Sequence, residues 1–293
     1  MIVNNFFSVP VWVRDILNNY ASLDAVSGDK IEKVKVALGR FKASAPEVSI
    51  VIPVYNEEKT LLRTLVSFSH METRHSVELI LVNNNSTDRT KEIAERLDVR
   101  VIDEPQQGIS FARQAGLNAA KGKYFLNADG DSIYPRGWID AYVHALTDES
   151  VACVYGTYSF FPSQGTPRMV LAAYEGATRL VFNLRRKKMD FFNVLGFNFA
   201  FRTNDGRKVG GFNTTRQRWS DAWMAMMLME YGQIKRLTLP EVRVWTSDRR
   251  LMIDGGIIKS IQKRLSKEVK YHTDTPDFEA ERREYKNKIR KQA

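Results

Sequence analysis

The feature that most constrains the fold of this chain is an alternation of strand-like and helix-like segments between Val48 and Asn127. Short runs of β-branched and other apolar residues are typical of strands buried on both faces, and apolar residues three and four positions apart are typical of helices. The expected strands are Val48–Ile52, Glu78–Val82, Val99–Ile102 and Lys123–Asn127. The expected helices between them lie at Leu61–Phe68, Ile93–Leu97 and Phe111–Ala119. This order predicts an α/β fold with a doubly wound, mostly parallel sheet flanked by helices.

The segments on either side of this region have a different character. Residues 1–46 are expected to form an N-terminal helical extension, because Ile31, Val34 and Leu38 repeat at helical spacing. The alternation occupies residues 47–150 and weakens over residues 151–252, where aromatic residues increase and a mixed half is expected. Residues 253–293 combine helical spacing with many lysines and arginines, which predicts a basic C-terminal helical tail.

Charge and cysteine content restrict the possible binding partners and the cellular compartment of the protein. The net charge of +10 gathers partly at Arg185–Lys188 and in the tail. One interpretation is a solvated basic face, and the other is attraction to an anionic membrane surface. No nucleic-acid-binding motif is present, so no nucleic-acid partner is predicted. The single cysteine, Cys153, lies in an apolar run and predicts a buried structural thiol in a reducing compartment.

The start of the chain resembles neither a signal peptide nor a membrane-spanning helix, since Asn, Pro, Arg and Asp interrupt its apolar groups. Together with the single cysteine, this predicts a cytoplasmic protein, with peripheral attachment to the inner face of the membrane where the basic segments meet anionic lipid.

Polar residues follow the expected strands where each one ends. Ligands of doubly wound sheets collect at the carboxyl ends of the strands. Asp129 and Asp131 follow the fourth strand with only Gly130 between them. In isolation this triplet is common in turns, but at this strand exit the two carboxylates suit one hard cation, Mn²⁺ or Mg²⁺, that also binds phosphate oxygens.

Several motifs in order carry a resemblance to a known family. The donor-side motifs are Val48–Glu57, Asn84–Asp88, Gly108–Gly116 and Asn127–Ser132; farther on come Gly196–Arg202, Gly210–Phe212, Asp221 and Thr246–Arg250. In this order and spacing they resemble family-two inverting glycosyltransferases of the GT-A, or Rossmann-like, fold. The resemblance implies that residues 47–150 bind a nucleotide-sugar donor and that residues 151–252 form the acceptor-side catalytic half.

The resemblance also implies a donor pocket. Tyr55 would stack on the nucleobase, which an aromatic ring suits because a base presents a π face, and Pro53 and Glu57 would line the pocket. Gly108 belongs to the same donor-binding set. Asn84 occupies the position at which many relatives carry an aspartate that pairs with uracil, so a UDP-sugar is favoured although the amide departs from that pattern.

Three arginines have two interpretations each. Arg113, on the third helix, either approaches the donor phosphates or lies on the surface. Arg249 and Arg250 resemble a paired arginine that closes over the diphosphate, a role that the guanidinium fork suits, and Arg250 is favoured over a structural role.

The acceptor side supplies the remaining candidates. Inverting transfer needs a general base for the acceptor hydroxyl, and the resemblance indicates Asp221; the alternative is a helix-capping aspartate. Arg218 and Trp219 are expected to contact the acceptor, with simple packing as the other interpretation of Trp219. The motif around them resembles that of processive synthases, but it precedes Asp221, so non-processive transfer is expected.

The function that follows is metal-dependent transfer of a sugar, hexosyltransferase-like, to a glycan or lipid-linked acceptor in cell-surface polysaccharide synthesis. One alternative is a sugar-phosphate nucleotidyltransferase, which should carry a glycine-rich basic loop after the first strand, where this chain has Pro53–Glu57. The other alternative is a basic nucleotide-binding module without catalysis, against which the joint presence of Asp129, Asp131 and Asp221 speaks.

Overall fold

The computed structural model describes residues 8–163, 165–186, 189–216, 219–249, 251, 259, 281–285 and 287. Most of the expected basic tail, residues 253–293, therefore lies outside the described residues. The main sheet has seven strands in the order β3-β2-β1-β4-β8-β6-β9. Its first four strands are parallel and match the sequence expectation: β1 Val48–Val54, β2 Val77–Asn83, β3 Arg100–Asp103 and β4 Tyr124–Asn127.

Strand β1 continues through Pro53, where the sequence predicted that it would end. The pairing of β1 with β4 ends at Val51 opposite Asn127. Pro53 therefore lies where β1 has a strand neighbour on one side only, opposite Val82 of β2. A proline is tolerated at such an edge position because no ladder partner needs its missing N–H.

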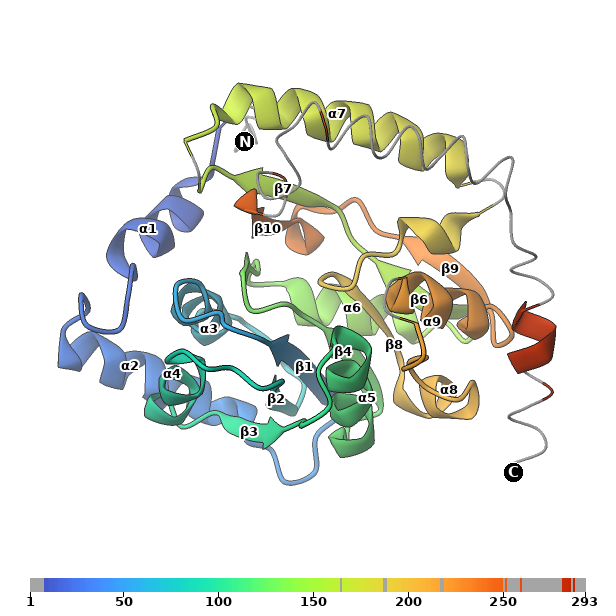
Figure 1. Ribbon diagram of the computed structural model, residues 1–293, viewed down its shortest axis with the longest axis horizontal. Coiled ribbons are helices and arrows are strands. Elements are labelled where there is room, and N and C mark those ends of the chain that lie inside the picture. Colours follow the sequence, from blue (N-terminus) through green and yellow to red (C-terminus); the bar gives the residue numbers. More distant parts are fainter. Residues whose placement is uncertain are drawn as a thin grey trace.

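Helices cover both faces of this sheet, as the apolar strands require. On one face lie α3 (Leu61–Ser69), α4 (Thr90–Arg96) and α6 (Trp138–Leu146), and on the other lies α5 (Ile109–Ala119). Alternate residues of β1 show the arrangement, since Ile50 and Ile52 pack in the first core and Val51 packs in the second. The predicted doubly wound α/β fold is confirmed (Figure 1).

The second half of the sheet is mixed, as expected. It contains β6 (Val151–Tyr155), β8 (Phe199–Arg202) and β9 (Gln233–Arg236), and β8 runs antiparallel to both β4 and β6. Two helices complete this half: α8 (Thr203–Lys208) and α9 (Ser220–Leu228). Helix α9 packs in the same core as α5, through Trp223 and several methionines.

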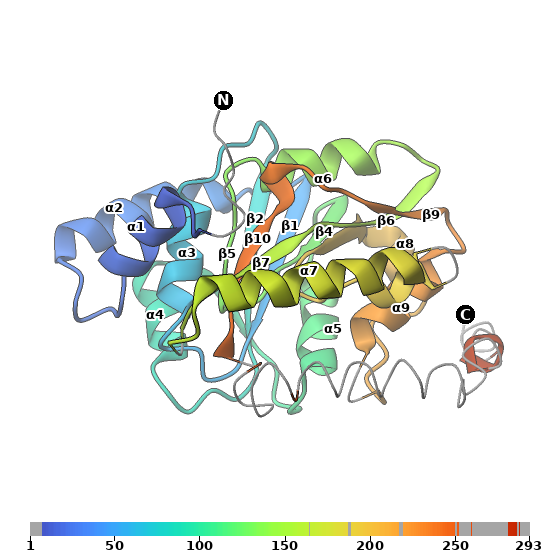
Figure 2. The same ribbon diagram turned by 90° about the horizontal axis from the view of Figure 1, so that it is seen from above.

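A second sheet, which the sequence did not indicate, has three short strands in the order β5-β10-β7. These are β5 (Ser132–Ile133), β10 (Val244–Ser247) and β7 (Tyr158–Phe161). Helix α7 (Arg168–Arg185) covers it and forms the outermost layer on that side of the molecule (Figures 1 and 2). The 3₁₀ turns η2 (Asp190–Asn193) and η3 (Pro240–Val242) connect this region to the main sheet.

The N-terminal extension is helical in its described part, as predicted. It consists of α1 (Val11–Asn19), α2 (Gly28–Leu38) and the 3₁₀ turn η1 (Gly39–Phe41). Ile31, Val34 and Leu38 are buried, and they join the core beneath α3. Among the residues that the structure describes, no helix is both long and apolar enough to span a bilayer.

Candidate active site

The two aspartates after β4 are held in place from both sides. The backbone N–H of Asp129 donates to the hydroxyl of Tyr134 (2.8 Å), and that hydroxyl donates to the carbonyl of Phe197 (2.9 Å). Burial raises the pKa of Tyr134, so its hydroxyl stays protonated. A Cβ on Gly130 would lie 2.9 Å from Cγ1 of Val54, so the loop packs directly on the end of β1. These contacts thus fix the backbone of Asp129 and Gly130 at the strand exit.

The three-stranded sheet β5-β10-β7 positions Asp131. Its backbone carbonyl accepts from the N–H of Ser247 (3.4 Å), and the adjacent Ser132 pairs with Thr246 across β5 and β10. Asp131 is buried, with 6% of the residue exposed. Strand β10 therefore brings the residues that follow it close to the aspartate pair after β4.

The chemistry of this aspartate pair fits a divalent cation. Oδ1 of Asp129 is buried and has no hydrogen-bond donor, although Nη2 of Arg113 lies 3.6 Å away. Such an oxygen retains ligand capacity that Mn²⁺ or Mg²⁺ can use. Within the described residues, no group of three or more His, Cys, Asp or Glu side chains could hold a metal ion. Asp129 and Asp131 would therefore need other oxygen ligands, such as phosphate, to complete the coordination.

Arg249 connects two of the strand exits. Its Nη2 atom donates to Oε1 of Glu57 (2.6 Å) and lies 3.7 Å from Oδ2 of Asp131. Thr60 donates to the other carboxylate oxygen of Glu57 (2.6 Å), which leaves that side chain fixed. Arg250, the arginine that the sequence favoured, lies outside the described residues, so the structure assigns a contact only to its neighbour.

Arg113 is a buried residue, and the surface interpretation of it is wrong. It is 5% exposed and lies in the second turn of α5. Its guanidinium lies between the two halves of the molecule: Nη2 is near Asp129, and Nη1 donates to the hydroxyl of Ser220 (3.2 Å) at the start of α9. Gly196 makes this position available, because a Cβ there would lie 1.7 Å from Nη2 of Arg113.

Asp221 lies in the first turn of α9, as expected, and both of its oxygens accept backbone hydrogen bonds. Oδ2 accepts from the N–H of Gly196 (2.8 Å), and Oδ1 accepts from the N–H of Ala222 (2.9 Å). The N-cap residue of α9, Trp219, does not cap the helix with its side chain. Gly196 thus touches both Arg113 and Asp221, which links the candidate base to the aspartate pair through one chain of contacts.

Trp219 has an unusual backbone conformation for its size. Its φ of 72° lies in the left-handed region, which favours glycine and costs free energy for a bulky residue. Its ring meets that of Phe192 edge to face, with the centroids 5.2 Å apart. Arg218, its predicted partner in acceptor binding, lies outside the described residues.

The expected nucleobase pocket contains the exposed ring of Tyr55 and a loop that Asn84 orders through hydrogen bonds. Tyr55 is 51% exposed at the end of β1, whereas Pro53 is buried within the strand. The amide of Asn84 donates to the carbonyls of Glu104 and Gln106 and accepts from the N–H of Gly108. Because these bonds use both amide hydrogens, Asn84 orders the loop before α5, and it could meet a base without losing them only by accepting a further hydrogen bond at its oxygen.

The contacts that Tyr134, Gly196 and Ser220 make in this site were not expected from the sequence. Tyr134 directly follows the aspartate loop and Gly196 begins one of the motifs that carry the resemblance, but neither position indicated the contact. Cys153 is fully buried, and burial raises its pKa well above the ordinary value, so it is the inert structural thiol that the sequence indicated.

Comparisons with known proteins agree with this geometry. The family profile described as Glycosyl transferase family 2 matches residues 49–209, more than half of the chain. Glycosyltransferase AglE of Haloferax volcanii is 31% identical over 132 residues, 42% of this chain and 43% of that protein. The uncharacterized glycosyltransferase EpsJ of Bacillus subtilis is 41% identical over 110 residues, 36% of this chain and 30% of that protein. The chain thus matches less than half the length of either relative.

Solved structures share the fold. The mannosyltransferase PcManGT from Pyrobaculum calidifontis, in complex with GDP-Man and Mn²⁺, superposes with a TM-score of 0.53 at 20% identity, over 74% of this chain and 63% of that one. The TarS fragment of S. aureus in complex with UDP superposes with a TM-score of 0.54 at 16% identity, over 69% of this chain and 60% of that one. At these identities the likeness shows the GT-A fold alone.

Proposed function

The chain belongs to glycosyl transferase family 2, and on that premise we propose that it is a metal-dependent inverting glycosyltransferase that uses a nucleotide-sugar donor. Its acceptor would be a glycan or a lipid-linked glycan in cell-surface polysaccharide synthesis. A cytoplasmic location, as predicted from the single cysteine, belongs to the same proposal.

One observation carries the proposal: a continuous series of contacts joins the expected donor-side carboxylates to the expected general base. Arg113 reaches Asp129 and Ser220, and Gly196 contacts both Arg113 and Asp221. A nucleotide-sugar bound at the aspartates would therefore have its sugar directed toward the start of α9. This arrangement suits transfer between two substrates better than binding of a nucleotide alone.

On the donor side, Asp129 and Asp131 would hold Mn²⁺ or Mg²⁺ together with the diphosphate oxygens. When bound, such a cation offsets the negative charge that builds on the departing nucleotide diphosphate. The guanidinium of Arg249, already beside Asp131, would bind the same diphosphate, because its fork matches phosphate oxygens. The exposed ring of Tyr55 would stack on the base. A UDP-sugar remains the favoured donor.

On the acceptor side, Asp221 would take the proton of the attacking hydroxyl. Its two backbone hydrogen bonds fix the position of the carboxylate. A fixed carboxylate at this point needs no large movement when the acceptor arrives. Trp219 and Arg218 would contact the acceptor sugar, and the strained backbone of Trp219 is consistent with a residue held for binding.

A donor panel tests this function. The purified protein would be incubated with UDP-, GDP- and dTDP-sugars and with Mn²⁺ or Mg²⁺, and released nucleotide would be measured with and without chelator. We expect one donor class to release nucleoside diphosphate, and chelator to abolish the release. Formation of a nucleotide-sugar and pyrophosphate from a sugar phosphate and a nucleoside triphosphate would instead support the nucleotidyltransferase. Binding without any turnover would support a non-catalytic module.

A further inference from the structure

Helix α7 presents an apolar face that is exposed in the part of the chain that the structure describes. Its inner face packs on the small sheet through Leu171, Tyr174 and Phe182. Its outer face carries large apolar side chains that are well exposed, among them Leu180 at 62% and Leu184 at 74%. The remaining exposed apolar and small residues of this face are Met169, Val170, Ala173, Gly176 and Ala177. We call these seven residues the α7 outer face.

No acidic side chain accompanies the α7 outer face. The only acidic residue of the helix is Glu175, which is buried, paired with Arg168 (2.9 Å) and bonded to the N–H of Phe160 (2.7 Å). The charge at the C-terminal end of the helix is positive: Arg185 and Arg186 end the helix, and the sequence continues with Lys187 and Lys188. An apolar strip with a basic end is the pattern that binds at the surface of an anionic membrane.

We propose that the α7 outer face is a docking surface for an anionic lipid bilayer. The strip from Met169 to Leu184 extends about 22 Å at 1.5 Å per residue, enough to lie along the interface between headgroups and acyl chains. Negatively charged lipid complements both the basic end of the helix and the net charge of +10. A second copy of the chain would instead bring a like charge against this face, which opposes self-association.

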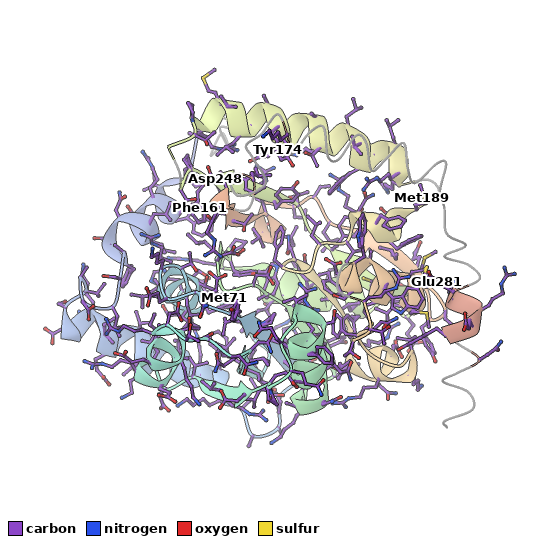
Figure 3. The ribbon with its side chains drawn as sticks, viewed as in Figure 1. Met71, Phe161, Tyr174, Met189, Asp248 and Glu281 are labelled. Atoms are coloured by element: carbon purple, nitrogen blue, oxygen red, sulfur yellow. The ribbon has the colours of Figure 1, made fainter. Side chains whose placement is uncertain are left out.

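The start of α7 is tied to the candidate active site. The N–H of Ser163, five residues before the helix, donates to Oδ1 of Asp248 (2.8 Å), and Asp248 directly precedes Arg249. Figure 3 labels Asp248 near Phe161, at the ends of β10 and β7, with Tyr174 above them on α7. Docking through α7 would therefore hold the donor site next to the bilayer. The docking itself does not depend on the proposed function, but its use for a lipid-linked acceptor does.

Vesicle sedimentation tests the docking surface. The full chain would be pelleted with phosphatidylcholine vesicles and with vesicles that also contain phosphatidylglycerol, at low salt. We expect pelleting with the anionic vesicles only. The double variant Leu180→Ser/Leu184→Ser should bind at least about 10-fold more weakly, because two exposed leucines no longer enter the interface. Arg186→Glu should weaken binding at low salt, and its difference from the parent should shrink as salt is raised, because salt screens the charge.

A matched control removes apolar surface elsewhere. Val36 on α2 and Leu239 before η3 are 70% and 52% exposed, so Val36→Ser/Leu239→Ser should pellet like the parent. Equal pelleting of the Leu180/Leu184 variant and the parent would overturn the proposal. So would a parent that is dimeric without lipid and a variant that is monomeric, since a second copy would then cover α7. Donor turnover in lipid-free solution, measured on the same variants, reports on the proposed function separately.

Discussion

The guanidinium of Arg249 lies 3.7 Å from the carboxylate of Asp131, and the same nitrogen donates to Glu57. A positive side chain thus neutralises part of the site at which a divalent cation is proposed to bind. Arg249 and the proposed metal would therefore compete for Asp131 when no nucleotide is present, and they would act together once a diphosphate supplies further negative charge.

Replacing Arg249 by alanine should have two opposite effects. Nucleoside diphosphate in the presence of Mn²⁺ should bind about 10-fold more weakly, since a charge-assisted hydrogen bond is lost. Mn²⁺ alone should bind more tightly, because a competing positive charge is removed. Calorimetry with each ligand checks both effects, and Arg250→Ala is the control that tells the neighbouring arginines apart. Unchanged affinities in Arg249→Ala would contradict this role.

The proposed metal site predicts that Asp131→Ala abolishes the metal-dependent part of nucleotide binding. Without this carboxylate the cation has one protein ligand left, Asp129, and the diphosphate charge is poorly offset. We expect the affinity for UDP, GDP and dTDP to fall at least about 10-fold with Mn²⁺ present and to become insensitive to chelator. Calorimetric affinities equal to those of the parent would show that the site is misassigned.

Adding a single methyl group at Gly196 should impair the function. In Gly196→Ala the new Cβ would lie 1.7 Å from Nη2 of Arg113, so the guanidinium must leave Asp129 and Ser220. Transfer should fall at least about 10-fold, and stability by about 1–3 kcal/mol. Gly176→Ala is the matched control: nothing lies within 4 Å of its Cβ, and within α7 it should stabilise the fold by about 0.5–1 kcal/mol. Transfer rates and thermal unfolding curves, measured on both variants, check these expectations.

Asp221→Asn separates the base from the backbone contacts. Transfer should fall about 10²- to 10⁴-fold, the usual contribution of a general base, while donor binding stays near that of the parent. The amide group keeps one acceptor where the carboxylate has two, so one of the N–H groups of Gly196 and Ala222 loses its partner. A stability loss of about 1–3 kcal/mol is therefore expected. Near-normal transfer by a folded Asp221→Asn protein would assign the proton to another group.

The sequence predicted the parallel half of the fold because each strand there is an unbroken apolar run followed by a helical segment. It could not predict β5 or β10. Strand β5 is two residues long, and β10 acquires its strand conformation by pairing with β5 and β7, which are distant in sequence. Propensity carries little information about such short strands, because their pairing partners determine them.

The candidate site shows the same limit at the level of single residues. The aspartate pair could be predicted because its spacing and its position after β4 are both features of neighbouring residues in the sequence. Arg249 and Arg250 are adjacent and chemically identical, so the sequence could not indicate the contact of Arg249 with Glu57, which depends on the backbone after β10. The central position of Arg113 was equally hidden, since it depends on the missing side chain of Gly196, 83 residues away along the chain.

The pairing of β5 with β10 has a consequence for the order in which the protein becomes functional during its synthesis. Ser132 meets Thr246, 114 residues later. The parallel strands β1 to β4 can pair while the ribosome is still adding the second half, but Asp131 acquires its neighbour Arg249 only after β10 has emerged. Closing such a long loop is slow compared with local pairing. On the proposed function, a nascent chain would therefore fold its parallel sheet well before it could retain a nucleotide.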